Sequence, residues 1–437
     1  MRITNRHQFL AHATGDARAA RDDALRCLEA ALRAADPYRA TRRALHRNGE
    51  TVVVDDNSYF LSRYQHIYLI GFGKASLGMA RAARQVFPVD KGAVITTERA
   101  TLEGLSVYTG THPLPSARNV EATRHLLDLV KEAGPGDLLV TLVSGGGSAL
   151  LCQPRISLEA MQTLTRELIN AGCTIQELNA VRRHLSTVKG GQLAAMSRAP
   201  VLSLIISDVI GDPLSSIASG PTAPDPTSFA HARQVLERYG LWDAHPDVCQ
   251  VISAGEAGDI SDTPSRLDHV HNVIVARNRQ ACQAACTTAE ERGYDARVVT
   301  TELSGEAREA GRDVAHFARV SPRERAAYIF GGETTVTVTG GGEGGRNQEL
   351  VLAAVPEMEG ERMVLLSCGT DGIDGASPAA GAMADGRSLQ RARELRLDPL
   401  DYLRRNDSHT FFKKMDDALF TGPTGTNVMD VVIALRY

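Results

Sequence analysis

The sequence lacks several features that mark whole classes of protein. Among its 437 residues there is one tryptophan, and 48 Lys and Arg against 52 Asp and Glu leave a net charge of -4. Without a basic excess, the composition argues against nucleic acid as a partner. No stretch approaches the roughly 20 apolar residues of a membrane span, and the first residues lack the apolar core of a signal peptide. We therefore expect a soluble, cytoplasmic protein that acts on small molecules and binds no membrane.

Motifs for catalysis by cysteine, histidine or serine are also missing. The seven cysteines are odd in number and form no CxxC pair, so we expect reduced thiols rather than disulfides. The histidines show no metal-ligand spacing, and no GxSxG elbow is present. Zinc hydrolysis and acyl transfer by a serine triad are therefore poorly supported.

The length and the order of segments predict two α/β domains. A chain of 437 residues exceeds what one hydrophobic core usually serves. We expect residues 1–250 to form a Rossmann-like, three-layer αβα domain with a mostly parallel sheet, and residues 251–437 to form a smaller domain with a mixed sheet. Helices within 16–47 are expected to cover the first sheet, and a strand at 271–276 to open the second α/β series. Whether the last strand returns to the first domain is left open.

A glycine-rich turn is the first feature that bears on chemistry. The apolar run 137–143 before it is typical of a buried strand in a parallel sheet. Three glycines between two serines leave the backbone N–H groups accessible to a ligand, and a following helix would add its dipole. The turn predicts a cradle for phosphate or carboxylate, with a flexible surface turn as the alternative. Its residues are Ser144, Gly145, Gly146, Gly147 and Ser148.

A second turn of this kind contains a lysine. The strand expected at 66–70 leads through Gly73 and Lys74 into a helix. The glycine spacing matches neither the dinucleotide fingerprint nor the Walker A motif, although Glu98 lies near the place of a ribose-binding acid. A lysine beside the positive end of a helix dipole is unfavourable unless an anion binds there. Lys74 is therefore predicted to be functional rather than a solvated surface lysine.

Two further features of the first half point to a site at the same edge of the sheet. Asn179 and Lys189 belong to a polar, largely helical segment, whose face is either solvent exposed or part of a substrate site. Asp208 follows the apolar run 201–206, and catalytic groups of α/β proteins gather at such strand ends. Asp208 is predicted to hold Mg²⁺ or to act as a general base, with a turn or capping aspartate as the alternative.

The second half repeats this arrangement. Two expected strands end close to acids, Glu333 for the first and Asp371 for the second. Five glycines precede Arg346 and Asn347, and they open onto a helix, which predicts a second anion cradle. The planar guanidinium of Arg346 suits phosphate or carboxylate.

Glycine-rich loops, a lysine, an arginine and several acids at strand ends are the parts that phosphoryl transfer needs. They supply N–H donors around the phosphates, cations for the developing charge, and acids for Mg²⁺ or for the proton of the nucleophile. The residues alone therefore favour a phosphotransferase.

Ten short segments, in this order along the chain, resemble the glycerate 2-kinase family (class II), whose C-terminal part is called the MOFRL domain. The segments are Gly71–Ser76, Thr111–Pro115, Ser144–Ser148, Asn179–Arg182, Lys189–Gly191, Ser207–Asp212, Gly331–Thr334, Gly345–Glu349, Gly369–Gly372 and Thr426–Asp430. Older naming placed such proteins among hydroxypyruvate reductases.

The resemblance implies ATP-dependent phosphorylation of D-glycerate to 2-phosphoglycerate with Mg²⁺, in a cleft between the two domains. It assigns the key lysine to Lys74, the key arginine to Arg346 and the strand-end acid to Asp208. Contacts to the nucleotide are expected from Gly73, Ser144, Gly145, Gly146, Gly147, Ser148, Asn179, Lys189, Glu333 and Asn347. Asp208 and Asp371 are the expected Mg²⁺ ligands.

Two other functions stay open at this point. A nicotinamide-dependent hydroxypyruvate reductase is suggested by the glycine turn before Lys74 and by Glu98. A non-catalytic sensor of nucleotides or sugar acids is less compatible with so many charged groups at strand ends. The sequence leaves the oligomeric state open, with a homodimer as one option.

Overall fold

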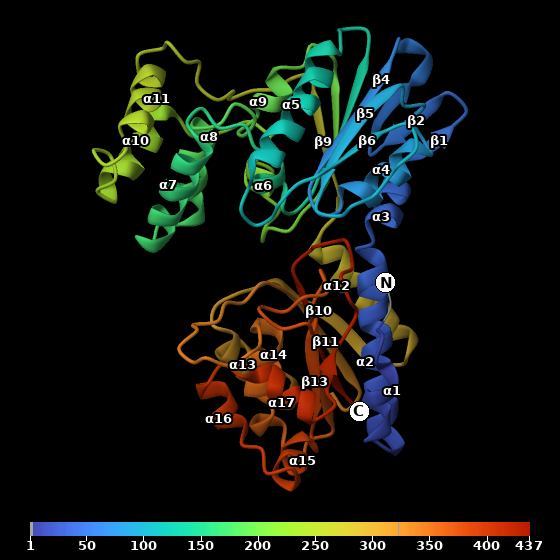
Figure 1. The fold of residues 1–437 in the computed structure, drawn as a ribbon. Helices are drawn as coiled ribbons and strands as arrows, with labels where there is room; N and C mark the ends of the chain where they lie inside the picture. The colour runs from blue at the N-terminus through green and yellow to red at the C-terminus, as the bar shows by residue number, and fades with distance from the viewer. Residues whose placement is uncertain (1–2, 322) are drawn as a thin grey trace. The chain divides into compact units, whose positions relative to one another are not determined.

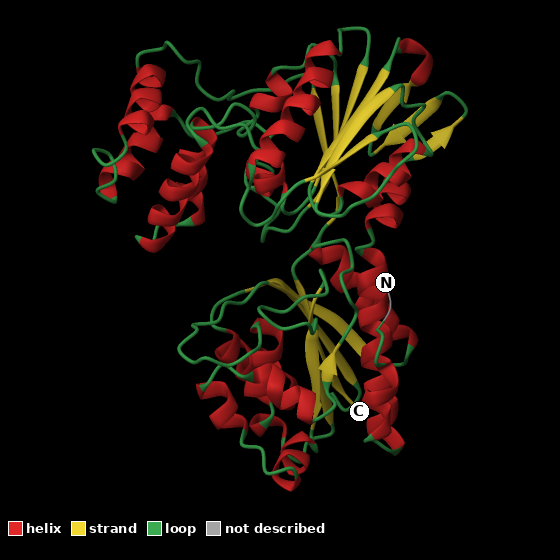
Figure 2. Cartoon of the chain, viewed as in Figure 1, coloured by secondary structure: helices red, strands yellow, loops and turns green. Residues whose placement is uncertain are grey.

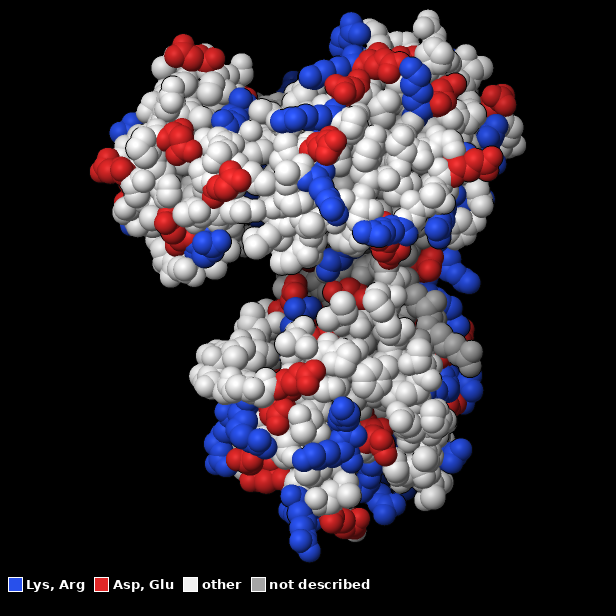
Figure 3. All heavy atoms as spheres, in the orientation of Figure 1, with Lys and Arg blue, Asp and Glu red and all other residues white. Residues whose placement is uncertain are grey.

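The computed structural model describes residues 3–321 and 323–437, and the chain forms two compact units (Figure 1). We call Ala40–Val275 the central unit, and Met1–Arg39 together with Ala276–Tyr437 the terminal unit, because the latter includes both chain ends. No helix in the described part of the chain is long and apolar enough to cross a membrane. On the face drawn in Figure 3, basic and acidic side chains are interspersed.

The central unit is built on a six-stranded sheet with the order β6-β5-β4-β7-β8-β9. Its strands are β4 (Ile67–Phe72), β5 (Lys91–Thr96), β6 (Ser106–Thr109), β7 (Leu138–Val143), β8 (Val201–Ile206) and β9 (Val270–Ala276). The pairs β5·β6, β4·β5, β4·β7 and β7·β8 are parallel. β4, β7 and β8 are buried along their whole length, which explains their continuous apolar sequences. Helices lie on both faces of the sheet (Figure 2).

The strand order of this sheet reverses between β4 and β7. After β4 the chain adds β5 and β6 on one side, whereas β7 and β8 lie on the other side. Phe72 pairs with Val143, and Val143 with Ile205, so these three strands end at the same level. The turns that follow them therefore meet at one edge, at the kind of switch point where open α/β sheets bind ligands.

The remaining elements of the central unit are short or helical. A separate antiparallel sheet consists of β1 (His46–Asn48), β2 (Thr51–Val54) and β3 (Asn57–Phe60). The helices are α3 (Pro37–Ala44), whose first three residues still count to the terminal unit, α4 (Ser76–Arg84), α5 (Ala117–Glu132), α6 (Gly147–Leu150), α7 (Leu158–Asn170), α8 (Ile175–His184), α9 (Gln192–Ala195), α10 (Phe229–Arg238) and α11 (Pro246–Glu256). Helices α7, α8, α10 and α11 share an apolar core of their own, which includes Leu164, Val181 and Leu236.

The terminal unit contains a mixed sheet with the order β10-β11-β15-β12-β13-β14. Its strands are β10 (Asp295–Leu303), β11 (Ala326–Gly332), β12 (Met363–Gly369), β13 (Gly381–Asp385), β14 (Ala418–Leu419) and β15 (Asp430–Arg436). The helices are α1 (Arg6–Ala11), α2 (Gly15–Ala34), α12 (Asn278–Glu291), α13 (Ala307–Arg319), α14 (Arg346–Ala354), α15 (Ser388–Glu394), α16 (Pro399–Arg404) and α17 (Ser408–Lys414). Strand β15 lies between β11 and β12 and is antiparallel to both, so the last strand does not return to the first domain.

Two of the predicted assignments to domains are wrong. Helix α2 packs against α12, β12 and β15 rather than on the first sheet. Its buried Arg21 donates to Asp385 (2.6 Å) and to Asp417 (2.7 Å), and a buried guanidinium needs such carboxylate partners. Strand β9 is an edge strand of the first sheet beside β8, not the start of the second series. The compact units therefore divide at residues 39/40 and 275/276 instead of at residue 250.

Candidate active site

Two turns meet at the switch point of the central sheet. The N–H of Lys74 donates to the Gly145 carbonyl at 2.9 Å, and the Ser144 hydroxyl accepts the N–H of Ala75 at 3.1 Å. Gly73 has a φ of +122°, and a Cβ atom at this position would collide with Ser144. Only glycine fits such a close approach with a positive φ. Gly73 and Ser144 thus fix the two turns against each other.

Charged side chains surround the bare backbone of this turn. A Cβ on Gly145 would collide with the Asp208 carboxylate, and a Cβ on Gly146 would lie 3.3 Å from Cγ of Lys74 and 3.1 Å from Cδ2 of His112. Within residues 3–321 and 323–437, no protein acceptor takes the N–H of Gly145 or of Gly146. Two N–H groups beside a lysine provide the donors that a phosphate needs. Burial, together with the charge of Lys74, lowers the pKa of the neighbouring His112.

The third glycine of the turn has a different role from the predicted one. The N–H of Gly147 donates to the Ser144 carbonyl at 3.1 Å. A Cβ on Gly147 would lie 2.7 Å from the Cβ of Ala218 and 3.2 Å from the ring of Phe72. Gly147 is therefore needed for close packing at the start of α6, and its N–H is satisfied within the protein.

Ser148, Asn179 and Lys189 come together behind the turn. The hydroxyl of Ser148 lies 2.8 Å from that of Ser219, which in turn donates to Oδ1 of Asn179 at 3.4 Å. The Lys189 ammonium donates to the carbonyls of Ser148 (2.6 Å) and Leu151 (3.1 Å). Asn179 and Lys189 are each only 4% exposed, so both support the turn from inside the protein. The solvent-exposed alternative for this helix face is wrong for these two residues.

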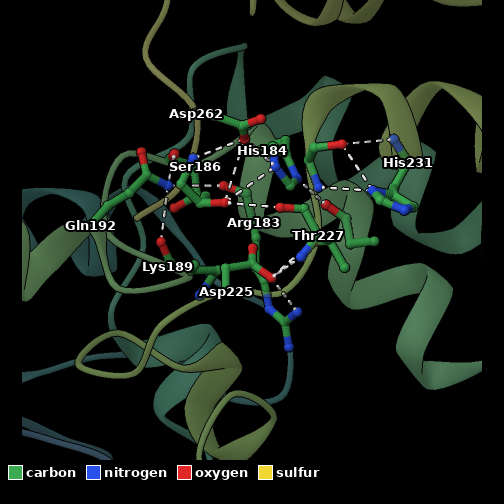
Figure 4. Close-up of polar contacts among 12 residues, drawn as sticks. Arg183, His184, Ser186, Lys189, Gln192, Asp225, Thr227, His231 and Asp262 are labelled. Carbon is green, nitrogen blue, oxygen red and sulfur yellow. Dashed lines mark hydrogen bonds and ion pairs between the residues drawn. The ribbon is translucent and has the colours of Figure 1, made fainter. Parts of the chain in front are cut away.

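The segment that carries Lys189 is held rigidly (Figure 4). Nη1 of Arg183 donates to Oδ1 of Asp225 at 2.9 Å, and Nε2 of His184 lies 2.8 Å from Oδ1 of Asp262. The side-chain amide of Gln192 donates to three backbone carbonyls between residues 183 and 189. These contacts fix α8 and the turn after it.

Replacing Gly145 with alanine tests the close approach of Asp208 to the turn. Gly145 does not need a positive φ, so alanine fits the backbone, but its methyl group would push Asp208 away. We expect turnover to fall at least about tenfold with a small change in thermal stability. Gly134→Ala is the matched control, because its methyl group would lie 3.6 Å from the nearest atom, Oδ2 of Asp137. Equal turnover of the two variants would contradict this view of the turn.

Lys189 should give the folded protein a stability that depends on pH. Burial, with a smaller effect of Arg182, lowers the pKa of Lys189 to about 7, whereas an unfolded lysine titrates near about 10.4. Between these values the unfolded chain binds more protons, so this residue makes stability rise with pH. The stability of wild type relative to Lys189→Met should be roughly 1–3 kcal/mol larger at pH 9 than at pH 7. Urea unfolding of both proteins at both pH values measures this difference in the free energy of unfolding. The same difference at pH 7 and pH 9 would contradict the expectation.

Arg346 opens helix α14 in the terminal unit and binds two carboxylates. Its Nε and Nη2 donate to Asp430 at 2.5 and 2.9 Å, and its Nη1 lies 2.6 Å from Glu333. The Asp430 side chain is 6% exposed and that of Glu333 is 41% exposed. Burial, with Asp430 and Asp371 nearby, raises the pKa of Glu333 although Arg346 opposes this. Arg346 and Glu333 line a cavity of about 490 Å³ within this unit.

The predicted second anion cradle is filled by the chain itself. The two carboxylate oxygens of Asp374 accept the N–H groups of Asn347 and Gln348, each at 2.9 Å, at the N-terminus of α14. The N–H of Gly340 donates to the Asn406 side chain at 2.9 Å. A carboxylate of the protein thus occupies the place predicted for a phosphate, and Asn347 is 1% exposed. The prediction of a ligand at this helix N-terminus is wrong.

The two predicted metal ligands lie in different compact units, Asp208 in the central and Asp371 in the terminal one. Oδ1 of Asp371 accepts the N–H of Ile373 at 3.1 Å. The described residues contain no group of three or more His, Cys, Asp or Glu side chains suited to a metal ion.

Known proteins share both the sequence and the fold. Residues 23–253 match a model described as a domain of unknown function (DUF4147), and residues 326–430 match the MOFRL family. Glycerate 2-kinase of Pyrococcus horikoshii is 38% identical over 428 residues, which cover 95% of this chain and 97% of that protein. The chain belongs to the glycerate 2-kinase family. The resemblance inferred from the motifs is thereby confirmed.

A second relative and a solved structure also resemble this member of the glycerate 2-kinase family in sequence and fold. D-glycerate 2-kinase of Thermotoga maritima is 41% identical over 84% of this chain and 90% of that protein. The solved structure of a glycerate kinase from Thermotoga maritima covers 95% of this chain and 99% of its own, with a TM-score of 0.85 and 37% identity. The prediction of two α/β domains, the second of MOFRL type, is confirmed.

Sequence reasoning missed three side chains that shape the site of this glycerate 2-kinase family member. Asp430 ends one of the segments that carry the family resemblance, and Asp374 lies two residues after another, but nothing in the sequence shows that Asp430 pairs with Arg346 and that Asp374 caps α14. His112, within the segment Thr111–Pro115, lies at the Gly146 turn.

Proposed function

We propose that the chain catalyses the ATP-dependent phosphorylation of D-glycerate at its 2-hydroxyl, giving 2-phosphoglycerate and ADP. The observation that carries the proposal is the meeting of Lys74, the bare Gly145–Gly146 backbone and Asp208 at the switch point of the central sheet. Relatives named glycerate 2-kinase that align over nearly the whole chain support it.

The residues have distinct parts in the reaction. Lys74 and the N–H groups of Gly145 and Gly146 bind the γ-phosphoryl group and stabilise the charge that develops on it. Asp208 accepts the proton of the 2-hydroxyl as the new O–P bond forms, while the bond from the γ-phosphorus to the oxygen of ADP breaks. Arg346 neutralises the glycerate carboxylate or the phosphoryl group.

Mg²⁺ fits the donor set of the central unit. Asp208 offers one carboxylate beside the turn, and Mg²⁺ bound with nucleotides commonly takes one or two carboxylates and completes its shell with phosphate and water oxygens. When bound, the ion would neutralise charge on the phosphates. Asp208 would be its ligand in the central unit, and in that case another group or a water molecule would accept the hydroxyl proton. Asp371 and Glu333 are the further candidates for contacts to the metal or the nucleotide.

Coupled assays test the proposal against its alternative. Two relatives from Agrobacterium vitis, 38% identical over 83% of this chain, have names that refer to a hydroxypyruvate reductase. ADP formation from ATP and D-glycerate, with 2-phosphoglycerate identified as the product, is the expected result. Loss of NADPH or NADH absorbance with hydroxypyruvate, without ADP formation, would overturn the kinase. L-Glycerate as the second substrate tests the preference for the D-enantiomer.

Location and assembly are part of the same proposal. All seven cysteines are free thiols and five of them are buried, which suits a reducing cytoplasm. A homodimer is the assembly we propose, and light scattering of the purified chain tests it.

A further inference from the structure

The central unit has a second cavity, of about 230 Å³, beside the glycine-rich turn. Its walls are mainly apolar and come from the loop Pro113–Pro115, from Met161 and Ile169 on α7, and from Leu178 on α8. The amide of Gln162 donates to the Pro115 carbonyl at 2.7 Å and ties the loop to α7. Glycerate has an oxygen atom on each of its three carbons, so it would leave these walls without a matching apolar partner.

The floor of this cavity is cationic and lacks counter-charges. Arg182 and Lys189 both line it. Burial lowers the pKa of each, and no carboxylate is among the groups that influence either pKa. The Arg182 guanidinium is charged in this partly dehydrated place, and an anion beside it would offset that cost and favour the protonated form of Lys189. The cavity therefore combines an apolar wall with a demand for negative charge.

A third observation concerns hydrogen bonding. Gln153 lines the cavity, and its buried Oε1 has no hydrogen-bond partner in the described part of the chain. A buried acceptor without a donor costs free energy until a ligand supplies an N–H. Ser148, which ends the glycine-rich turn, also lines the cavity, so the cavity adjoins the proposed phosphate site.

We propose that this cavity receives the adenine nucleoside of ATP, with the base between the apolar walls, its exocyclic amine donating to Gln153, and the α-phosphate at Arg182 and Lys189. A flat base with apolar faces, polar edges and an attached phosphate has all three properties that the cavity demands. The proposal rests on the proposed kinase function and adds where the nucleotide base binds.

A pair of variants on α7 tests the pocket. Thr165 lines the cavity, whereas Thr163, two residues away on the same helix, does not. Thr165→Trp should fill the pocket and weaken ADP binding at least about tenfold in calorimetry, whereas Thr163→Trp should bind ADP like wild type. Inorganic tripolyphosphate should bind equally to all three proteins, because it has no base. The KM for ATP should rise in Thr165→Trp with the KM for D-glycerate unchanged.

The hydrogen bond to the base has its own test. Inosine diphosphate has a carbonyl where ADP has the exocyclic amine, so wild type should prefer ADP, and Gln153→Leu should remove the preference. Unchanged ADP binding by Thr165→Trp would overturn the proposal, and so would a Thr165→Trp variant in which only the KM for D-glycerate rises. Absence of ADP binding to wild type would also overturn it. If wild type binds ADP in the pocket but does not phosphorylate glycerate, the proposed function fails while the base pocket stands.

Discussion

Replacing Lys74 with alanine is expected to lower turnover by about three orders of magnitude while the fold survives. The Lys74 side chain lies against the Gly146 turn, and the adjacent N–H groups of Gly145 and Gly146 have no protein acceptor in the described residues. The ammonium group would therefore be the main cation of the central unit at the transferred phosphoryl group. Its loss would cost more in the transition state than in the ground state, so kcat falls further than the affinity for ATP.

ADP release under saturating substrates measures this effect, and circular dichroism checks the fold. Lys91→Ala is the matched control, since Lys91 lies on the neighbouring strand β5 with a side chain that is 55% exposed and pairs with Glu132. This control should keep normal turnover. Near-normal turnover of Lys74→Ala would remove Lys74 from the mechanism.

The fold could be predicted from the sequence because its strands have strong local signals. β4, β7 and β8 are short, mainly apolar segments that are followed by glycine or serine, and such segments are typical of a buried parallel sheet. Parallel strands also align their carboxyl ends, so Lys74, the glycine-rich turn and Asp208 could be placed together before any coordinates. The α/β class and the edge of the sheet where charged groups meet follow from these apolar segments and the turns after them.

The division into units could not be predicted, because it depends on contacts between distant parts of the chain. The amphipathic pattern of α2 shows which of its faces is buried, but not against which sheet. Arg21 settles this, and its carboxylate partners, Asp385 and Asp417, lie more than 360 residues later in the chain. The same limit applies to β9, because its sequence predicts a strand but does not show that this strand pairs with β8.

The second cradle illustrates the same limit within a site. Glycines before a helix predict an anion at its N-terminus, and an anion is indeed present there. It is the carboxylate of Asp374, from a loop 27 residues after Asn347. Sequence patterns indicate which charge a helix end prefers, but they do not show whether the protein or a ligand supplies it.

Replacing Arg346 with lysine is expected to lower turnover by about two to three orders of magnitude, although the positive charge stays. Asp430 binds Nε and Nη2 of Arg346 and fixes the plane of its guanidinium group. Nη1 points to Glu333, whose side chain is the more exposed of the two acids. We therefore expect a substrate anion to replace Glu333 as the partner of Nη1. A lysine at this position has a single nitrogen, and Asp430 would already bind it.

Arg308→Lys separates this effect from the loss of an ion pair. Arg308 also forms a fork, with two nitrogens 3.0 and 2.6 Å from Oε1 of Glu349, and it belongs to the same unit. Both variants should lose a similar amount of stability in thermal unfolding, because each replaces a planar fork by a point charge. Only Arg346→Lys should lose turnover. A similar loss of turnover in both variants would show that the ion pairs stabilise the unit and that Arg346 has no separate part in the reaction.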